Sequence, residues 1–137
     1  MKILATVLTA AMIFTASVVS SQKKTITATV VNVTSDSGKV SFALYNKDNF
    51  MKAPLQAKEA KIVEGKSEVI FENVAPGDYA ILCFHDKNEN GKMDFQDNGM
   101  PMEDYGASNN VMSFGPPTYM NSKFTLAKED LKLEIKF

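Results

Sequence analysis

Apolar and polar residues alternate one by one through most of the chain from residue 25 to its end. The final segment is the clearest case, since Leu131, Leu133, Ile135 and Phe137 alternate with lysine or glutamate. Successive side chains of a β-strand point to opposite faces, so a period of two predicts strands with one buried face. Helical periodicity extends over no more than one or two turns in this region. The sequence therefore predicts an all-β protein.

The first residues of the chain follow a different pattern. Lys2 precedes an apolar run that ends in small residues, with Val19 and Ser21 at positions -3 and -1 of a cleavage site. That order is typical of a secretory signal peptide. A membrane anchor is the alternative, but the apolar run has only about 17 residues, the lower limit for spanning a bilayer. We expect residues 1–21 to be removed on export, leaving a single domain over 22–137, periplasmic or extracellular, with no membrane span.

Turn-forming residues divide the alternating region into seven candidate strands. The turn at 35–38 separates the first two strands, which we therefore expect to pair as a hairpin. The apolar run at 79–84 predicts a strand in the middle of a sheet. Seven short strands in a chain of this length are typical of an antiparallel β-sandwich, such as the immunoglobulin-like fold. The candidate strands span residues 25–33, 40–45, 58–64, 68–74, 78–85, 122–126 and 131–137.

Residues 86–121 interrupt this pattern with one long polar loop, which we expect to be ordered. A segment of that length without strands usually has a function or an order of its own. Its first part, residues 86–104, carries six acidic residues and two lysines, whereas the whole chain has a net charge of -1. We call residues 86–104 the acidic loop; a solvated face is the simplest interpretation of such a charge excess. In the second part, Tyr105, Phe114 and Tyr119 are expected to anchor the loop to the sheet or to form a ligand surface.

The spacing of oxygen-bearing residues in the acidic loop nearly matches the calcium loop D-x-[DN]-x-[DN]-G. Asp86, Asn88 and Asn90 occupy positions 1, 3 and 5, and Gly91 occupies position 6, where the chain must turn sharply. Calcium binds about six to eight oxygens, which alternate residues around a glycine turn supply. We therefore predict a calcium site. Its predicted ligands are Asp86, Asn88, Asn90, the backbone carbonyl of Lys92, Asp94 and Asp97.

Three features depart from the calcium-loop pattern. Two of the first three ligands are neutral asparagines, position 12 is Asp97 where glutamate is usual, and no helices flank the loop. The asparagines lower the charge of the site, and the shorter Asp97 makes bidentate closure less assured, so Glu103 and Asp104 are alternative ligands. A hydrogen-bonded Asn-Gly turn without metal is the competing interpretation. A site of millimolar affinity would still function outside the cell.

A catalytic function has few candidate residues. His85 is the sole histidine, and it lies two residues after the sole cysteine, Cys83, hence on the same face of a strand. The apolar neighbours of Cys83 favour a buried thiol. A carboxylate pair drawn from Asp86, Glu103 and Asp104 is the other catalytic option. The usual hydrolase, zinc-protease and phosphate-loop patterns are absent, so we expect a non-catalytic module, with a small secreted enzyme or a carbohydrate-binding module as alternatives.

Composition excludes several classes of protein. All 15 basic residues are lysine and they are outnumbered by 16 acids, so nucleic acid is not an expected partner. A single cysteine excludes a disulfide within the chain. We expect a monomer whose partner is a protein or a glycan.

The middle of the chain resembles a known family. It carries N-x-x-P-G-x-Y-A, then H-D-x-N-x-N-G-x-x-D, then G-x-P-x-E-x-Y-G-x-S-N. Together these patterns resemble the exported bacterial domain-of-unknown-function family 2141, and the P-G-x-Y turn is also similar to that of transthyretin-like sandwich modules. The resemblance implies export and a β-sandwich, and no particular activity. The matching residues are Asn73, Pro76, Gly77, Tyr79, Ala80, His85, Asp86, Asn88, Asn90, Gly91, Asp94, Gly99, Pro101, Glu103, Tyr105, Gly106, Ser108 and Asn109.

Overall fold

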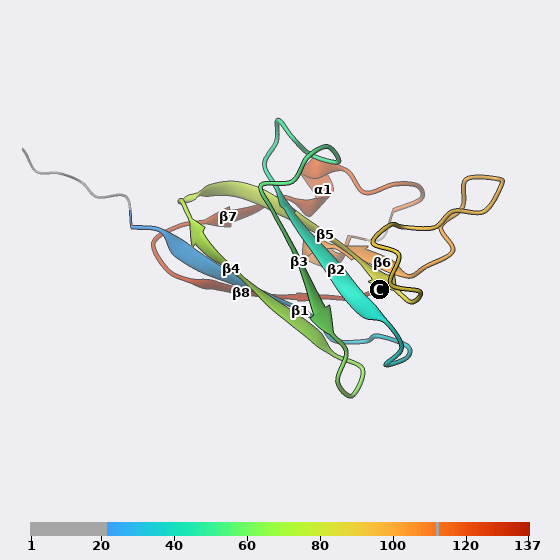
Figure 1. The fold of residues 1–137 in the computed structure, drawn as a ribbon. Coiled ribbons are helices and arrows are strands. Elements are labelled where there is room, and N and C mark those ends of the chain that lie inside the picture. Colours follow the sequence, from blue (N-terminus) through green and yellow to red (C-terminus); the bar gives the residue numbers. More distant parts are fainter. Residues whose placement is uncertain (1–21, 112) are drawn as a thin grey trace, which may run out of the picture.

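The computed structural model describes residues 22–111 and 113–137. The expected signal peptide, residues 1–21, lies outside the described residues. Strands far outnumber helices among the regular elements of the described chain (Figure 1), which confirms the all-β class. No helix among the described residues is long and apolar enough to cross a membrane. The elements are β1 (Lys24–Val30), β2 (Lys39–Tyr45), β3 (Gln56–Lys61), β4 (Ser67–Val74), β5 (Gly77–Asp86), β6 (Tyr105–Ala107), η1 (Ser108–Asn110), α1 (Tyr119–Ser122), β7 (Phe124–Leu126) and β8 (Leu131–Ile135).

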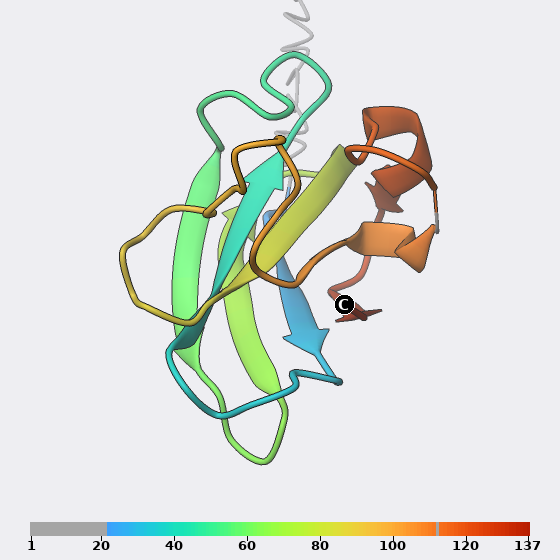
Figure 2. The same cartoon turned by 90° about the vertical axis from the view of Figure 1, so that its right-hand side faces the viewer.

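The strands form two sheets, and their packing gives the β-sandwich that the sequence predicted (Figures 1 and 2). One sheet has the strand order β4-β1-β8, and the other has the order β3-β2-β5-β6. β7 pairs with the beginning of β5, on the side where β6 pairs with its middle. All these pairs are antiparallel except β1 with β8, which run parallel.

Alternating side chains build the core between the two sheets. In β2, Val40, Phe42 and Leu44 are at most 1% exposed, and the residues between them are half-buried. Ile26 and Val30 of β1 belong to the same core from the opposite sheet. Burying a side chain of this size contributes about 1.5–3 kcal/mol relative to leaving it exposed. The period of two thus determines which face of each strand is buried.

The predicted hairpin between the first two strands is wrong. β1 pairs with β4 and β8, whereas β2 pairs with β3 and β5, so the connection over residues 31–38 crosses from one sheet to the other. Both strands have one apolar face, and placing them in opposite sheets lets both faces meet in one core. Two backbone hydrogen bonds hold the crossing: Val31 N–H donates to Ile135 C=O at 3.2 Å, and Val33 N–H donates to Gly65 C=O at 2.8 Å.

The long polar loop contains a strand that the sequence did not predict. β6 has three residues and pairs with the segment Leu82 to Phe84 of β5. Its central residue, Gly106, passes close to the end of β8, since a β-carbon there would lie 2.6 Å from the carbonyl oxygen of Lys136. Three residues around a glycine carry too little alternation to predict a strand. All seven predicted strands are present, with ends shifted by up to three residues.

Candidate metal-binding loop

The acidic loop leaves β5 at Asp86, rejoins the sheet at β6 and projects beyond the strands (Figures 1 and 2). His85 N–H donates to Asp104 C=O at 2.8 Å, which joins the two ends of the loop. The Thr34 hydroxyl, from the β1–β2 connection, donates to the Asp104 carboxylate at 3.1 Å. Gly38 in the same connection is so close that a β-carbon there would lie 2.2 Å from the carbonyl oxygen of Asp86. The base of the acidic loop is therefore fixed to the sandwich.

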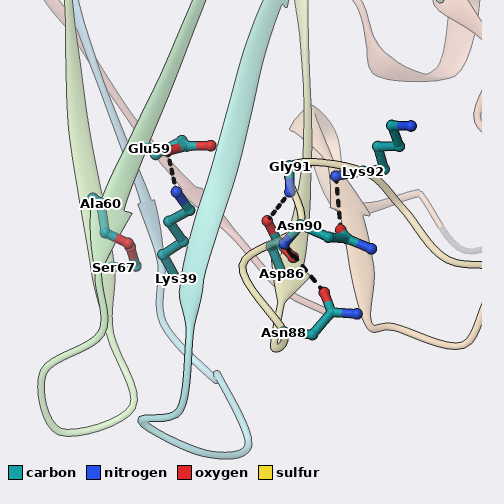
Figure 3. Close-up of polar contacts among 9 residues, drawn as sticks. All are labelled: Lys39, Glu59, Ala60, Ser67, Asp86, Asn88, Asn90, Gly91 and Lys92. Atoms are coloured by element: carbon teal, nitrogen blue, oxygen red, sulfur yellow. Dashed lines mark hydrogen bonds and ion pairs between the residues drawn. The ribbon is translucent and has the colours of Figure 1, made fainter.

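Asp86 organises the first turn of the acidic loop. The residue is 0% exposed, and its two carboxylate oxygens accept the backbone N–H groups of Asn90 at 3.2 Å and Gly91 at 2.8 Å (Figure 3). Such donors are needed because burying an unpaired charge is costly. Gly91 has a φ of 74°, a left-handed conformation that glycine adopts without strain. The sharp turn expected at Gly91 is therefore present.

Three further predicted ligands, Asn88, Asn90 and Asp94, come together beside this turn. The side-chain amides of Asn88 and Asn90 each donate to the Asp94 carboxylate at 2.8 Å. The side-chain oxygens of Asn88 and Asn90 accept the backbone N–H groups of Asn90 at 3.3 Å and Lys92 at 2.9 Å (Figure 3). These are the contacts of a hydrogen-bonded Asn-Gly turn. A carbonyl or carboxylate oxygen has two lone pairs, so an oxygen that accepts one backbone N–H keeps the capacity to bind a cation.

The structure separates Asp97 from the other predicted ligands. Asp97 is exposed in the turn of a small hairpin over residues 94–102, and it shares no hydrogen bond with those ligands in the described part of the chain. Glu103, by contrast, is only 7% exposed. Its two carboxylate oxygens accept the N–H groups of Lys87 at 2.9 Å and Asp94 at 3.0 Å. Glu103 therefore closes the acidic loop from inside, through the backbone of Lys87 and Asp94.

Within the described part of the chain, no lysine forms an ion pair with a carboxylate of the acidic loop. Among residues 22–111 and 113–137, the only ion pair joins Lys39 to Glu59 at 2.5 Å (Figure 3). The hydrogen bond to Glu59 raises the pKa of Lys39, and the nearby carboxylates of Glu89 and Asp86 raise it further. Unpaired carboxylates in one loop form a negative region that attracts cations. No group of three His, Cys, Asp or Glu side chains in the described residues is arranged to hold a metal ion, so a site here would have to include asparagine oxygens.

His85 and Cys83, the candidate catalytic residues, face the interior. His85 is 0% exposed; its Nε2 lies 2.6 Å from the Ser37 carbonyl oxygen, and its Nδ1 has no partner among the described residues. Cys83 is 3% exposed, which confirms the expected buried thiol, and its Sγ lies 3.6 Å from the Gly106 carbonyl oxygen. Burial raises the pKa of this thiol, so it stays protonated at neutral pH. Neither side chain is accessible to a substrate in this structure.

The second part of the polar loop contains a residue with a structural role that the sequence did not reveal. Ser108 is 1% exposed, and its hydroxyl accepts the N–H of Ile81 at 3.0 Å and donates to the Ser122 carbonyl. Ile81 lies between the segment of β5 that pairs with β7 and the segment that pairs with β6. The Ser108 hydroxyl therefore replaces a missing strand partner in the middle of the sheet.

Asn109 and Asn110 extend this arrangement with their side-chain amides. The Asn109 amide donates to two backbone carbonyls of the α1–β7 segment, at 3.2 and 2.6 Å. The Asn110 amide donates to Glu134 C=O at 2.9 Å, and its oxygen accepts Lys136 N–H at 2.8 Å. Both asparagines have positive φ, 71° and 53°, which asparagine tolerates better than most residues. We call residues 108–110 the Ser-Asn-Asn turn; its sequence signals were the adjacent asparagines and the S-N that ends the third family pattern.

A cleft of about 550 Å³ lies beside the acidic loop, on the outer face of the β3-β2-β5-β6 sheet. Tyr105, at the cleft, is 38% exposed. Of the aromatic residues expected to anchor the polar loop, Tyr119 packs edge-on against Phe50, with 5.7 Å between the ring centroids. Phe114, in contrast, is fully exposed. The cleft thus joins the acidic loop to an apolar surface of the sheet. Its lining includes Ala43, Tyr45, Leu82, Phe84, Met93 and Tyr105.

Comparison with known proteins identifies one related family. A family model described as "Uncharacterized protein conserved in bacteria (DUF2141)" matches residues 28–134. The match runs from β1 to β8 and includes the whole acidic loop and the Ser-Asn-Asn turn. It confirms the resemblance derived from the three sequence patterns. No curated protein and no solved structure matches the chain significantly.

Proposed function

We propose a function from the geometry, since the chain belongs to this family of uncharacterized bacterial proteins and the family description assigns no activity. The protein is an exported, non-catalytic β-sandwich module whose acidic loop binds calcium. The module binds a protein or glycan in the periplasm or outside the cell. One observation carries the proposal: Asp86, Asn88, Asn90 and Asp94 meet in one turn, and no carboxylate of the acidic loop is ion-paired within the described residues.

The donor set suits calcium, a hard cation that takes oxygen ligands. Asp86, Asn88, Asn90 and Asp94 would supply side-chain oxygens, and Lys92 would supply its backbone carbonyl. The amide N–H groups of Asn88 and Asn90 now face the Asp94 carboxylate. A half turn of each carboxamide exchanges its N–H groups for its oxygen, so the same residues can serve either the hydrogen-bonded turn or a cation. Two neutral ligands favour weak binding, in the millimolar range typical of extracellular calcium modules.

The non-catalytic part of the proposal is supported by the state of the candidate catalytic groups. His85 and Cys83 are buried. The carboxylates of Asp86 and Glu103 accept backbone N–H groups within the loop, which occupies them in a structural role. A general acid or base needs to reach its substrate within hydrogen-bond distance, and none of these four groups is placed to do so.

Thermal unfolding in calcium and in chelator tests the proposal. With a dissociation constant near 1 mM, about 10 mM calcium stabilises the folded state by about 1.4 kcal/mol, which raises Tm by about 5 °C for a domain of this size. Asp94→Asn and Asp97→Asn remove the same charge from the same loop. We expect Asp94→Asn to lose most of the shift and Asp97→Asn to keep it, because only Asp94 lies among the proposed ligands.

Two outcomes contradict the calcium proposal. One is an unchanged Tm for the unsubstituted protein at 10 mM calcium, about ten times the expected dissociation constant. The other is an equal loss of the shift in both variants, which would mean that calcium responds to the net charge of the loop and not to a defined site. Magnesium at equal concentration is the ionic control, because it demands near-ideal octahedral geometry and dehydrates reluctantly.

Of the two kinds of partner, a glycan is favoured by exposed aromatic rings within the polar loop. Phe95 is 57% exposed, Tyr105 is 38% exposed and Phe114 is fully exposed. Aromatic side chains supply apolar faces, and tyrosine adds a hydroxyl for hydrogen bonding. Binding to an array of bacterial glycans, with Tyr105→Ala as the variant, tests it. Loss of binding at unchanged Tm supports a glycan site at the cleft; equal binding by both proteins contradicts it.

A further inference from the structure

A small hairpin within the acidic loop, residues 94–102, carries two methionines on one face. Gln96 N–H donates to Met100 C=O and Met102 N–H donates to Asp94 C=O, each at 2.8 Å. These bonds pair the two arms of the hairpin as antiparallel strands, in which side chains two residues apart lie on the same face. Met100 and Met102 therefore share a face, with Asp94 opposite Met102 on the other arm.

Both methionine side chains are exposed to solvent. Met100 is 59% exposed and Met102 is 61% exposed, whereas Pro101 between them is half-buried and bridges to Phe95 on the other arm. Scattered exposed apolar residues are common, but adjacent ones on a projecting structure indicate a site of interaction. The exposure leaves both thioether sulfurs available to a ligand.

Thioether sulfur has a distinct ligand chemistry. It is a soft donor that selects copper(I) over hard cations such as calcium or magnesium. Alternate residues of a strand are about 6.8 Å apart, and methionine has three rotatable bonds, so both sulfurs can reach one ion between them.

We propose that Met100 and Met102 form a two-sulfur site for a soft monovalent cation, copper(I) or silver(I). The site is distinct from the proposed calcium site, because calcium does not compete for thioether sulfur and the hairpin is closed by its own backbone hydrogen bonds. Cys83 is the one stronger sulfur ligand in the chain, and it is buried in the core. Met51 and Met120 are also exposed, 56% and 72%, but they lie on other segments.

Titration with silver(I) tests the site without redox chemistry. In chloride-free buffer, with the methionine methyl groups labelled with carbon-13, we expect the Met100 and Met102 resonances to shift together and to saturate at one equivalent. The double variant Met100→Leu/Met102→Leu keeps the size and apolar character of the side chains and removes both sulfurs. We expect it to bind silver at least tenfold more weakly, whereas the matched control Met51→Leu/Met120→Leu binds like the unsubstituted protein.

Three outcomes overturn the proposal. Equal silver affinity of the two double variants would mean that Met100 and Met102 bind silver no more tightly than other exposed methionines. Proportional shifts of all methionine resonances would indicate non-specific binding. Loss of the folded circular-dichroism signal on silver addition would indicate capture by Cys83 after unfolding. The titration is performed with and without calcium, and an unchanged result supports the independence of the two sites.

Discussion

The two parts of the polar loop use the same kinds of polar side chain over very different distances. In the acidic loop, the side chains of Asn88 and Asn90 bond to groups no more than six residues away. In the Ser-Asn-Asn turn, Ser108 and Asn110 bond to backbone 27 and 24 residues away, in β5 and β8. Local bonds can rearrange without disturbing the sandwich, whereas long-range bonds are part of the fold. The Ser-Asn-Asn turn therefore contributes to the stability of the fold, whereas the side chains of the acidic loop are free to serve a ligand.

The largest effect is expected for Ser108→Ala. The substitution leaves the N–H of Ile81 and the carbonyl of Ser122 without their hydroxyl partner in a buried place. Each unsatisfied buried group costs about 1–3 kcal/mol, so we expect a loss of about 3 kcal/mol in the free energy of unfolding. Urea denaturation measures it. Ser35→Ala, at an exposed position, is the control. An equal loss of stability in the two variants would contradict the structural role of the Ser-Asn-Asn turn.

Asn110→Gly is expected to have the next largest effect. Glycine keeps the positive φ of 53° without strain, so the variant removes only the two hydrogen bonds to Glu134 and Lys136. Two net hydrogen bonds are worth about 2 kcal/mol. Asn110→Ala should cost about 1 kcal/mol more, because alanine in the left-handed region is strained. Denaturant midpoints of the two variants test this; equal midpoints would show that the backbone conformation is not enforced.

The alternation of residues was enough to predict the sandwich, but not the neighbours of each strand. It reports which side chains are buried, and the buried face of β8 follows it. Pairing depends on contacts between distant segments, such as the parallel register of Ile26 with Leu131. The turn at 35–38 therefore suggested a hairpin, where the chain in fact crosses between sheets. β6 escaped prediction because its order comes from the β5 edge that it pairs with.

Local spacing likewise predicted the part of the candidate site that is built locally. Asp86, Asn88, Asn90 and Asp94 meet within nine residues, because a turn at Gly91 folds them together. Asp97 lies in the turn of the hairpin over residues 94–102, away from the Gly91 turn. Glu103 closes the loop instead, through the N–H groups of Lys87 and Asp94. The partners of the Ser-Asn-Asn turn lie in other strands, so no local pattern could identify them. Calcium binding itself stays a prediction.

Alkaline pH tests the stability of the sheet beside the Ser-Asn-Asn turn. Cys83 of β5 lies there, with its thiol against the backbone of Gly106, just before the turn. Burial raises the pKa of this thiol above its ordinary value of 9.0. The unfolded chain therefore loses the thiol proton above about pH 9 while the folded protein keeps it, and stability falls as pH rises. Between pH 9 and 10 the loss is about 1 kcal/mol. Urea denaturation at both pH values measures the fall in the free energy of unfolding. Cys83→Ala should make this fall smaller by about 1 kcal/mol. An unchanged pH dependence in the variant would mean that the Cys83 thiol becomes accessible in the folded state.

The smallest change in global stability is expected for Glu103→Gln, although this residue closes the acidic loop. The substitution replaces one of two acceptor oxygens, so the N–H of Lys87 or of Asp94 loses its partner. Lys87 is exposed and Asp94 is half-buried, so water can replace the acceptor that the N–H loses. We therefore expect the free energy of unfolding to fall by less than about 0.5 kcal/mol, since the loop can open locally without unfolding the sandwich. Hydrogen exchange should nevertheless show at least tenfold faster exchange of one of these two amides, at unchanged exchange of Ile81. A global loss as large as that of Ser108→Ala would mean that the acidic loop, too, is part of the fold, and that a ligand binding there acts on the whole sandwich.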